Sequence, residues 1–219
     1  MGRRPQREQG DTLAEIRAAA FGLFGRYGYD GVSIADVASA AGVTKPALYW
    51  HFPNKDALYI DALLQLQSLF RAHVFEPMAK EPDPLERMVT FFTGAAALVA
   101  DPRIAGGVAG YWLDPSTARL PQAREVLVGF EREAEGFVAA TLHDAVGRGQ
   151  VRSEIDVSVI AQTAISVLQA IVLPMLMRGE AHTRGTIAAL AYTFFRAYAV
   201  DPAVAQRAMS LKGGPSPAR

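Results

Sequence analysis

Residues 33–52 decide the fold, and they read SIADVASAAGVTKPALYWHF. Apolar Ile34 and Val37 recur at helical spacing and predict a short first helix with one apolar stripe. Ser33 precedes that stripe and is a favourable N-cap residue. Gly42 follows the helix and reaches the left-handed backbone conformation of a tight turn at little cost, because it has no Cβ. The first half of the stretch therefore predicts a helix followed by a reversal of the chain.

A second short helix follows this turn. Thr44 is a good N-cap, and Pro46 falls in the first turn, where a missing N–H is tolerated. Leu48 and Phe52 are expected to point inward. The outward side chains are Lys45, Ala47, Tyr49, Trp50 and His51. Two short helices joined by a tight turn predict a helix-turn-helix whose second helix enters a DNA major groove. The alternative is a helical hairpin with a partly buried aromatic cluster.

The residue types on this face suit DNA contacts. Lys45 can donate to guanine O6 or N7, and Pro46 and Ala47 can offer apolar contact to a thymine methyl group. Lys55, at the start of the next helix, is placed for a phosphate. Ser33 is placed for one too, through its hydroxyl and the N–H groups of its helix start.

The residues 32–38 and 41–55 resemble the N-terminal signature of the TetR family of transcriptional regulators. The resemblance covers about the first quarter of the chain. It implies that Tyr49, Trp50 and His51 reach phosphates or the wall of the groove. It also implies a pocket for a small, often apolar molecule among the middle helices. The expected DNA-binding residues are Ser33, Thr44, Lys45, Pro46, Ala47, Tyr49, Trp50, His51 and Lys55.

Composition limits the alternatives. The chain has 219 residues, 22 basic and 22 acidic, so any DNA binding must come from a local patch on a neutral body. It has no cysteine, which excludes disulfides and a cysteine-based zinc site. The first eleven residues are basic without an apolar core like that of a signal peptide, so we expect a cytoplasmic protein.

The remaining chain predicts helices throughout. A long helix from Lys55 to about Val74 is expected to end at Glu76-Pro77, and the chain from Asp201 is expected to fray. Further helices are predicted at 85–100, 122–146, 156–177 and 183–199. The helix at 156–177 is apolar nearly all round. A membrane span is possible on length, but polar residues recur and no basic flank precedes it. We therefore expect the last two long helices to form a homodimer interface.

Residues that could line the implied pocket are apolar or aromatic, with one glutamine among them. They are Phe70, Met88, Phe91, Phe92, Trp112, Phe130, Phe137 and Gln169. For each of them plain core packing is the alternative. No charged cluster indicates an anionic ligand or a metal.

Catalytic motifs are absent. The four histidines are scattered without an HExxH pattern, and the chain has no GxSxG and no dinucleotide fingerprint. We therefore expect no enzyme activity, no catalytic residues, no bound metal and no cofactor.

Together these observations predict an all-α protein. A three-helix, helix-turn-helix DNA-binding domain with an N-terminal arm (1–55) precedes a larger helical bundle for ligand binding and dimerisation (56–205) and a flexible tail (206–219). The expected function is that of a sequence-specific regulator, a repressor released from an inverted-repeat operator on double-stranded DNA by a small, largely apolar effector. An activator or partner-responsive regulator without a pocket is one alternative. An enzyme or carrier with a vestigial DNA-binding domain is another.

Overall fold

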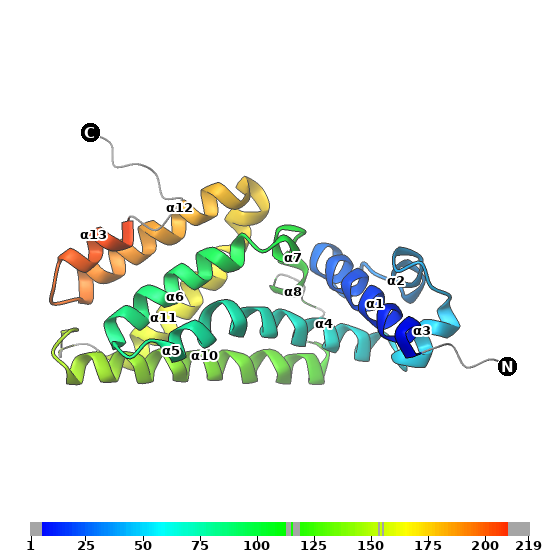
Figure 1. Cartoon of the computed structure of the whole chain (residues 1–219), viewed down its shortest axis with the longest axis horizontal. Helices are drawn as coiled ribbons and strands as arrows, with labels where there is room; N and C mark the ends of the chain where they lie inside the picture. The colour runs from blue at the N-terminus through cyan, green and yellow to red at the C-terminus, as the bar shows by residue number, and fades with distance from the viewer. Residues whose placement is uncertain (1–5, 113–114, 116–118, 153, 155, 210–219) are drawn as a thin grey trace. The chain divides into compact units, whose positions relative to one another are not determined.

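The computed structural model describes residues 6–112, 115, 119–152, 154 and 156–209, and helices make up most of this part of the chain (Figure 1). No strand occurs within those ranges, where an isolated antiparallel bridge joins Val151 to Ala199. The predicted all-α fold is confirmed. None of the helices in these ranges combines the length and the apolar character that crossing a bilayer requires.

The elements follow one another with short connections. They are α1 (Gln6–Tyr27), α2 (Ile34–Ala40), α3 (Lys45–His51), α4 (Lys55–Phe70), the π-helix η1 (Arg71–Phe75), α5 (Glu76–Lys80), α6 (Pro84–Val99), α7 (Pro102–Ala105), α8 (Ala109–Trp112), α10 (Pro121–Gly147), α11 (Val157–Ala170), α12 (Val172–Tyr198) and α13 (Ala203–Met209).

The chain packs as two compact units. Unit 1 runs to Gln67 and includes Gly106–Val128, whereas unit 2 takes Ser68–Ala105 and the chain from Gly129 onward. Helices α4 and α10 therefore each begin in unit 1 and end in unit 2. The regions predicted from the sequence, 1–55, 56–205 and 206–219, divide the chain by function and stay a prediction.

Unit 1 contains the predicted helix-turn-helix. Ser33 and Asp36 form a capping box at the start of α2, and the Thr44 hydroxyl oxygen accepts the Ala47 N–H at 3.3 Å at the start of α3. Gly42 has φ 64° in the turn between them, and the side chain of Leu48 is fully buried. Local caps and one apolar position per turn are therefore enough to explain this motif.

Helix α1 takes in part of the expected N-terminal arm, because it starts at Gln6. It ends at Tyr27, and Gly28 follows with φ 71°, a conformation that glycine adopts at little cost. Residues 1–5 lie outside the described part of the chain.

The expected helix end at Glu76-Pro77 is wrong. The helical path continues through η1 into α5 and stops at Lys80. The N–H of Glu76 bonds to the carbonyl oxygen of Arg71, five residues back, so a new helical segment starts there with Pro77 in its first turn. Proline is tolerated in a first turn, because the N–H group that it lacks would have no partner within the helix there. Helix α6 crosses η1 so closely that a Cβ on Gly94 would lie 2.3 Å from the carbonyl oxygen of His73.

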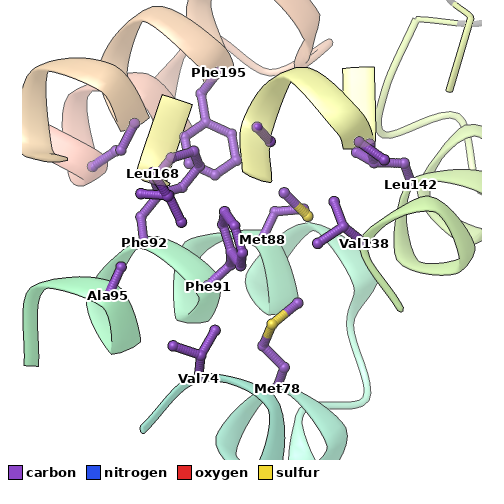
Figure 2. Packing of buried hydrophobic residues seen from close by; sticks show 14 of the residues in the cluster. Val74, Met78, Met88, Phe91, Phe92, Ala95, Val138, Leu142, Leu168 and Phe195 are labelled. Carbon is purple, nitrogen blue, oxygen red and sulfur yellow. The ribbon is translucent and has the colours of Figure 1, made fainter. Parts of the chain in front are cut away.

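Unit 2 has an apolar core to which several helices contribute (Figure 2). Helix α6 supplies the largest share, and η1, α5, α10, α11 and α12 pack around it. The labelled residues of this core are Val74, Met78, Met88, Phe91, Phe92, Ala95, Val138, Leu142, Leu168 and Phe195. Burial of this many large side chains accounts for the stability of the bundle.

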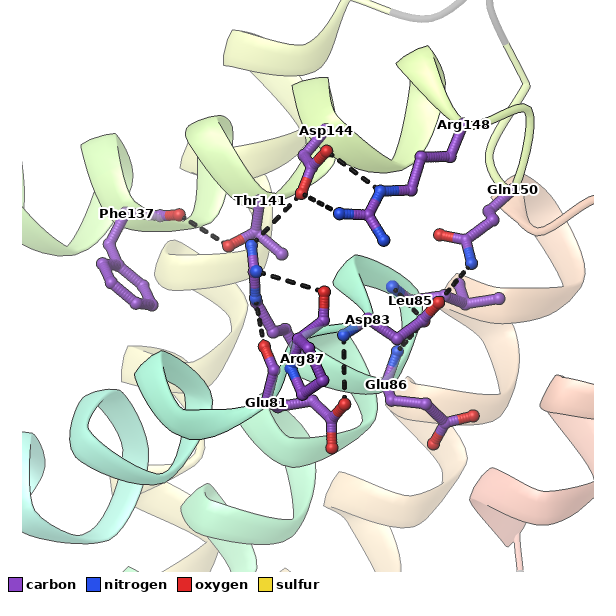
Figure 3. Close-up of polar contacts among 11 residues, drawn as sticks. Glu81, Asp83, Leu85, Glu86, Arg87, Phe137, Thr141, Asp144, Arg148 and Gln150 are labelled. Atoms are coloured by element: carbon purple, nitrogen blue, oxygen red, sulfur yellow. Dashed lines mark hydrogen bonds and ion pairs between the residues drawn. The ribbon is translucent and has the colours of Figure 1, made fainter.

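A polar network joins the start of α6 to the end of α10 (Figure 3). Asp83 accepts the N–H groups of Leu85 and Glu86 and also accepts the Gln150 side-chain amide at 2.6 Å. Arg87 donates to the carboxylate of Asp144 at 3.3 Å. The network joins the start of α6 to the end of α10 through residues that are 57 and 67 positions apart in the sequence.

The last two long helices differ from the sequence prediction. The break falls at Ile171, between α11 and α12, and not between Met177 and Thr183. Within α12 the backbone of Gly179 leaves the helical region with φ 77°. Pro174 lies in the first turn of α12, where it is tolerated, so the apolar run could not reveal the break.

Helix α13 occupies part of the chain that was expected to fray from Asp201. Val204, Ala205 and Ala208 recur at helical spacing and are buried against the core of unit 2. Helix α13 thus extends to Met209, past the start of the tail predicted at 206. Residues 210–219 lie outside the described part of the chain.

Asp101 is a buried carboxylate at the start of α7. It accepts two hydrogen bonds from the Arg103 guanidinium, at 2.9 and 2.7 Å, and the Nε2 atom of His73 lies 3.0 Å from its Oδ2. The bonds from Arg103 hold the pKa of Asp101 well below its usual range, against the opposing effect of burial.

This lowered pKa predicts a loss of stability in acid. A carboxyl whose pKa is lower in the folded than in the unfolded state stabilises the fold above its unfolded pKa of about 3.9, and that contribution is lost as the pH falls further. We expect Asp101→Asn to cost about 1–3 kcal/mol at pH 7. In urea unfolding measured from pH 7 to pH 3, the difference from the wild type should shrink below about pH 4. A difference that stays constant over this range would contradict the assignment.

Candidate nucleic-acid interface

Helix α3 has a buried and an exposed side. Leu48 is 0% exposed and Phe52 is buried, as predicted, whereas Tyr49 is 50% and Trp50 73% exposed. Lys45 and Pro46 are also exposed, and Ala47 and His51 are half-buried. The Trp50 and His51 rings meet edge to face with centroids 5.0 Å apart. A large aromatic side chain this exposed contributes little to folding and is available to a partner.

An open groove of about 570 Å³ lies between the starts of α2, α3 and α4 in unit 1. It brings together four of the predicted site residues: Ser33, Lys45, Tyr49 and Lys55. The sequence prediction missed its two carboxylates, Asp30 and Asp36. The groove is therefore mixed in charge, and its affinity for a polyanion depends on how the carboxylates are neutralised.

Asp36 is a charged carboxylate whose hydrogen bonds are made within the capping box of α2. The backbone N–H and the hydroxyl of Ser33 both donate to Asp36 Oδ2, at 2.8 and 2.6 Å. These bonds hold the pKa of Asp36 below its ordinary value, so it is ionised. The predicted contact from Ser33 to a phosphate requires Asp36 to give up one of these donors.

Tyr29 positions Lys55 and was also missed from the sequence. The Lys55 Nζ lies 4.1 Å from the centroid of the Tyr29 ring, and the Tyr29 hydroxyl donates to the carboxylate of Asp56. Burial, followed by the hydrogen bond and charge of Asp56, raises the pKa of Tyr29 to about 12. A cation–π contact of this kind holds the ammonium group at the groove. The sequence around Tyr29 signals only a turn after α1.

The candidate ligand residues fall into separate groups. Met88, Phe91 and Phe92 are buried in the core of unit 2. Phe70, at the end of α4, and Phe130 and Phe137, on α10, are half-buried and pack against that core. The rings of Phe70 and Phe130 lie 5.5 Å apart, and the Arg71 guanidinium lies 5.4 Å from the Phe130 ring centroid.

Two candidates do not join these groups. Gln169 is exposed on α11, next to the buried Leu168. The side chain of Trp112 lies outside the described part of the structure. No cluster of three or more histidine, aspartate or glutamate side chains suited to a metal occurs among the described residues.

Comparison with known proteins assigns the chain to a family. Residues 16–62 match the model described as "Bacterial regulatory proteins, tetR family". The probable HTH-type transcriptional regulator ArpR of Pseudomonas putida is 31% identical over 164 residues, which cover 72% of this chain and 76% of that protein. The chain belongs to the TetR family. The match to the family model takes in the second half of α1, all of α2 and α3 and the first half of α4, so it includes the outward side chains of α3.

Two other TetR-like relatives agree with this assignment. The HTH-type transcriptional regulator AcrR of Shigella flexneri is 36% identical over 86 residues, which cover 39% of this chain and only 40% of AcrR. A crystal structure described as a gamma-butyrolactone receptor (ArpA-like protein) has a TM-score of 0.70 and is 26% identical. That comparison covers 93% of this chain and 98% of the receptor. The TetR fold thus extends over nearly the whole chain, although the sequence likeness to AcrR does not.

Proposed function

We propose that the chain is a sequence-specific DNA-binding repressor that a small molecule releases from an inverted-repeat operator. The observation that carries the proposal is the exposed face of α3, in the segment that matches the TetR family model. Lys45 would choose bases, and Lys55 would fix the position of the duplex through a phosphate. Thr44, Pro46, Ala47, Tyr49, Trp50 and His51 would complete this surface.

A homodimer is part of the proposal. Helix α11 exposes Val159, Gln162, Ser166 and Gln169 at helical spacing, and α12 exposes Met177. A partner subunit covering this face would bury its apolar groups. Twofold symmetry would then match an inverted repeat with half-sites about one or two helical turns apart.

The proposed effector is small and largely apolar. Most candidate lining residues are apolar or aromatic, and a similar fold serves in a gamma-butyrolactone receptor. The effector would act by binding better to a dimer whose recognition helices are wrongly spaced for DNA, and so would shift the population toward it. Helix α4 is the proposed link, because it starts at Lys55 and continues into unit 2.

A regulator that activates, or that answers to a protein partner, would share the exposed face of α3 but need no ligand pocket. A vestigial DNA-binding unit on an enzyme or carrier would not select DNA. Selection of bound DNA from a random pool by the full chain separates a regulator of either kind from an enzyme or carrier with a vestigial DNA-binding unit. We expect one palindrome to be enriched, and recovery of no preferred sequence would reject the proposed function.

Variants of the two groove lysines give the next prediction. On the enriched palindrome, Lys45→Ala should lower discrimination at one base position by about 1–3 kcal/mol. Lys55→Ala should weaken all sequences similarly and reduce the slope of log K against log salt by about 0.9. Binding measured over a salt series checks both.

Lys80→Ala is the matched control, because this exposed lysine lies on α5 in unit 2. It should leave both discrimination and slope unchanged. Wild-type behaviour of both groove variants would show that the assigned residues are wrong.

A further inference from the structure

The segment from Gly106 to Val128 belongs to unit 1, although it lies more than fifty residues beyond the helix-turn-helix. Its first part is bonded to α1, because the Arg26 guanidinium donates to the Gly106 carbonyl at 3.1 and 3.2 Å. The buried Tyr111 hydroxyl donates to the Phe21 carbonyl at 2.8 Å. Its last part is bonded to α4, where the Gln67 side chain donates to the Val126 carbonyl at 2.9 Å. Both ends of this segment are thus fixed within unit 1.

Arg119 extends from this segment to the groove. Its Nη2 lies 2.7 Å from Asp30 Oδ2, in an ion pair between residues 89 positions apart. Asp30 lines the same groove as Lys45 and Lys55. The side chains of Arg119 and Asp30 are 68% and 66% exposed, so both remain accessible to a large charged partner.

The ion pair changes the charge of the groove. Two lysines and two carboxylates would otherwise balance, and Asp36 is already held by Ser33 inside the capping box. An ionised Asp30 repels an approaching phosphate because both are negative, and salt screens this repulsion only beyond the Debye length of about 8 Å at physiological ionic strength. Pairing with Arg119 offsets this repulsion and leaves the groove net positive.

We propose that Arg119 belongs to the DNA-binding surface and acts by neutralising Asp30 at the edge of the groove. The inference rests on the proposed function and adds to it a positioning residue outside the helix-turn-helix. An exposed ion pair contributes little to folding stability. The effect of Arg119 is therefore on operator affinity and its salt dependence, and not on the fold.

The test is a double-mutant cycle in the full chain, measured on the palindrome recovered by selection. Arg119→Ala should weaken binding about threefold to fivefold at low salt, and Asp30→Asn should tighten it by a similar factor. In the Asp30→Asn background, Arg119→Ala should have little further effect, because no carboxylate remains to be neutralised. Arg119→Lys should restore most of the wild-type affinity.

Matched controls separate this role from a structural one. Arg207→Ala removes a similarly exposed, ion-paired arginine of unit 2 and should leave affinity unchanged. The urea unfolding midpoints of all variants should agree with the wild type, since a role in folding would move them.

Three results would overturn the inference. Wild-type affinity of Arg119→Ala would show that the ion pair does not affect DNA binding. An equal loss in the Asp30→Asn background would show that Arg119 meets the DNA directly and not through Asp30. Failure of the wild-type chain to select any sequence would reject the proposed function, and the role of Arg119 with it.

Discussion

Phe91→Ala should lower the free energy of unfolding by about 3–5 kcal/mol, the usual cost of removing a fully packed phenylalanine. Phe91 is 0% exposed, and its ring lies 5.2 Å from that of Phe92 in the core of unit 2. Val74, Met78 and Met88 surround it in Figure 2. Removing the ring loses its transfer free energy and leaves a cavity that helices fixed on several sides cannot collapse around.

This measurement also decides between two interpretations of the same residue. If Phe91 is ordinary core, the full cost is expected. If it lines an effector pocket, part of its surface already faces empty space, and the cavity term is correspondingly smaller. Urea unfolding of the ligand-free chain gives the value, and a loss below about 1.5 kcal/mol would indicate pocket lining.

Phe130→Ala is the matched comparison. Phe130 is half-buried on α10, and the guanidinium of Arg71 stands over its ring. Its removal should cost about 1–2 kcal/mol, because solvent can fill part of the space it leaves. A Phe130→Ala loss equal to that of Phe91→Ala would mean that burial does not explain the difference between the two groups of candidate residues.

The helix-turn-helix could be predicted because its signals are local. Ser33 and Thr44 cap helices within three residues of themselves, Gly42 supplies its own turn, and Leu48 is the fully buried side chain of α3. No distant part of the chain is needed to specify these features. For the same reason the exposure of Lys45, Tyr49 and Trp50 could be predicted, although Ala47 and His51, also expected to point outward, are half-buried.

Features that depend on distant contacts were not predicted. Pro77 ends a helix in most contexts, but here the π-helix before it starts a new segment that packs against α6. Gln169 was a candidate pocket residue, but it is exposed on α11. The spacing of apolar residues in the sequence does not say which side of α11 meets the core. Asp30 and Arg119 form an ion pair although they are 89 positions apart in the sequence. The sequence around neither residue indicates the other.

Two glycines of α1, Gly22 and Gly25, allow the contact between α1 and the segment 106–112 to be tested by substitution. A Cβ built on Gly25 would lie 2.3 Å from the carbonyl oxygen of Gly107, whereas a Cβ on Gly22 meets nothing within 4 Å. Gly107 has φ 110°, so its backbone is itself in a conformation that few residues adopt. Helix α8 lies beside α1 in Figure 1, and the close approach requires glycine at position 25.

We expect Gly25→Ala to destabilise the protein by about 1–3 kcal/mol, because the new methyl group must displace backbone and not a flexible side chain. Gly22→Ala, three residues earlier in the same helix, should stabilise it by up to about 1 kcal/mol through better helix propensity. Both changes remove one glycine from the unfolded chain, so that effect cancels between them. The difference, about 1–4 kcal/mol in urea unfolding, isolates the contact with Gly107. Equal effects of the two substitutions would mean that residues 106–112 do not pack on α1, and would also remove the support that carries Arg119 to the groove.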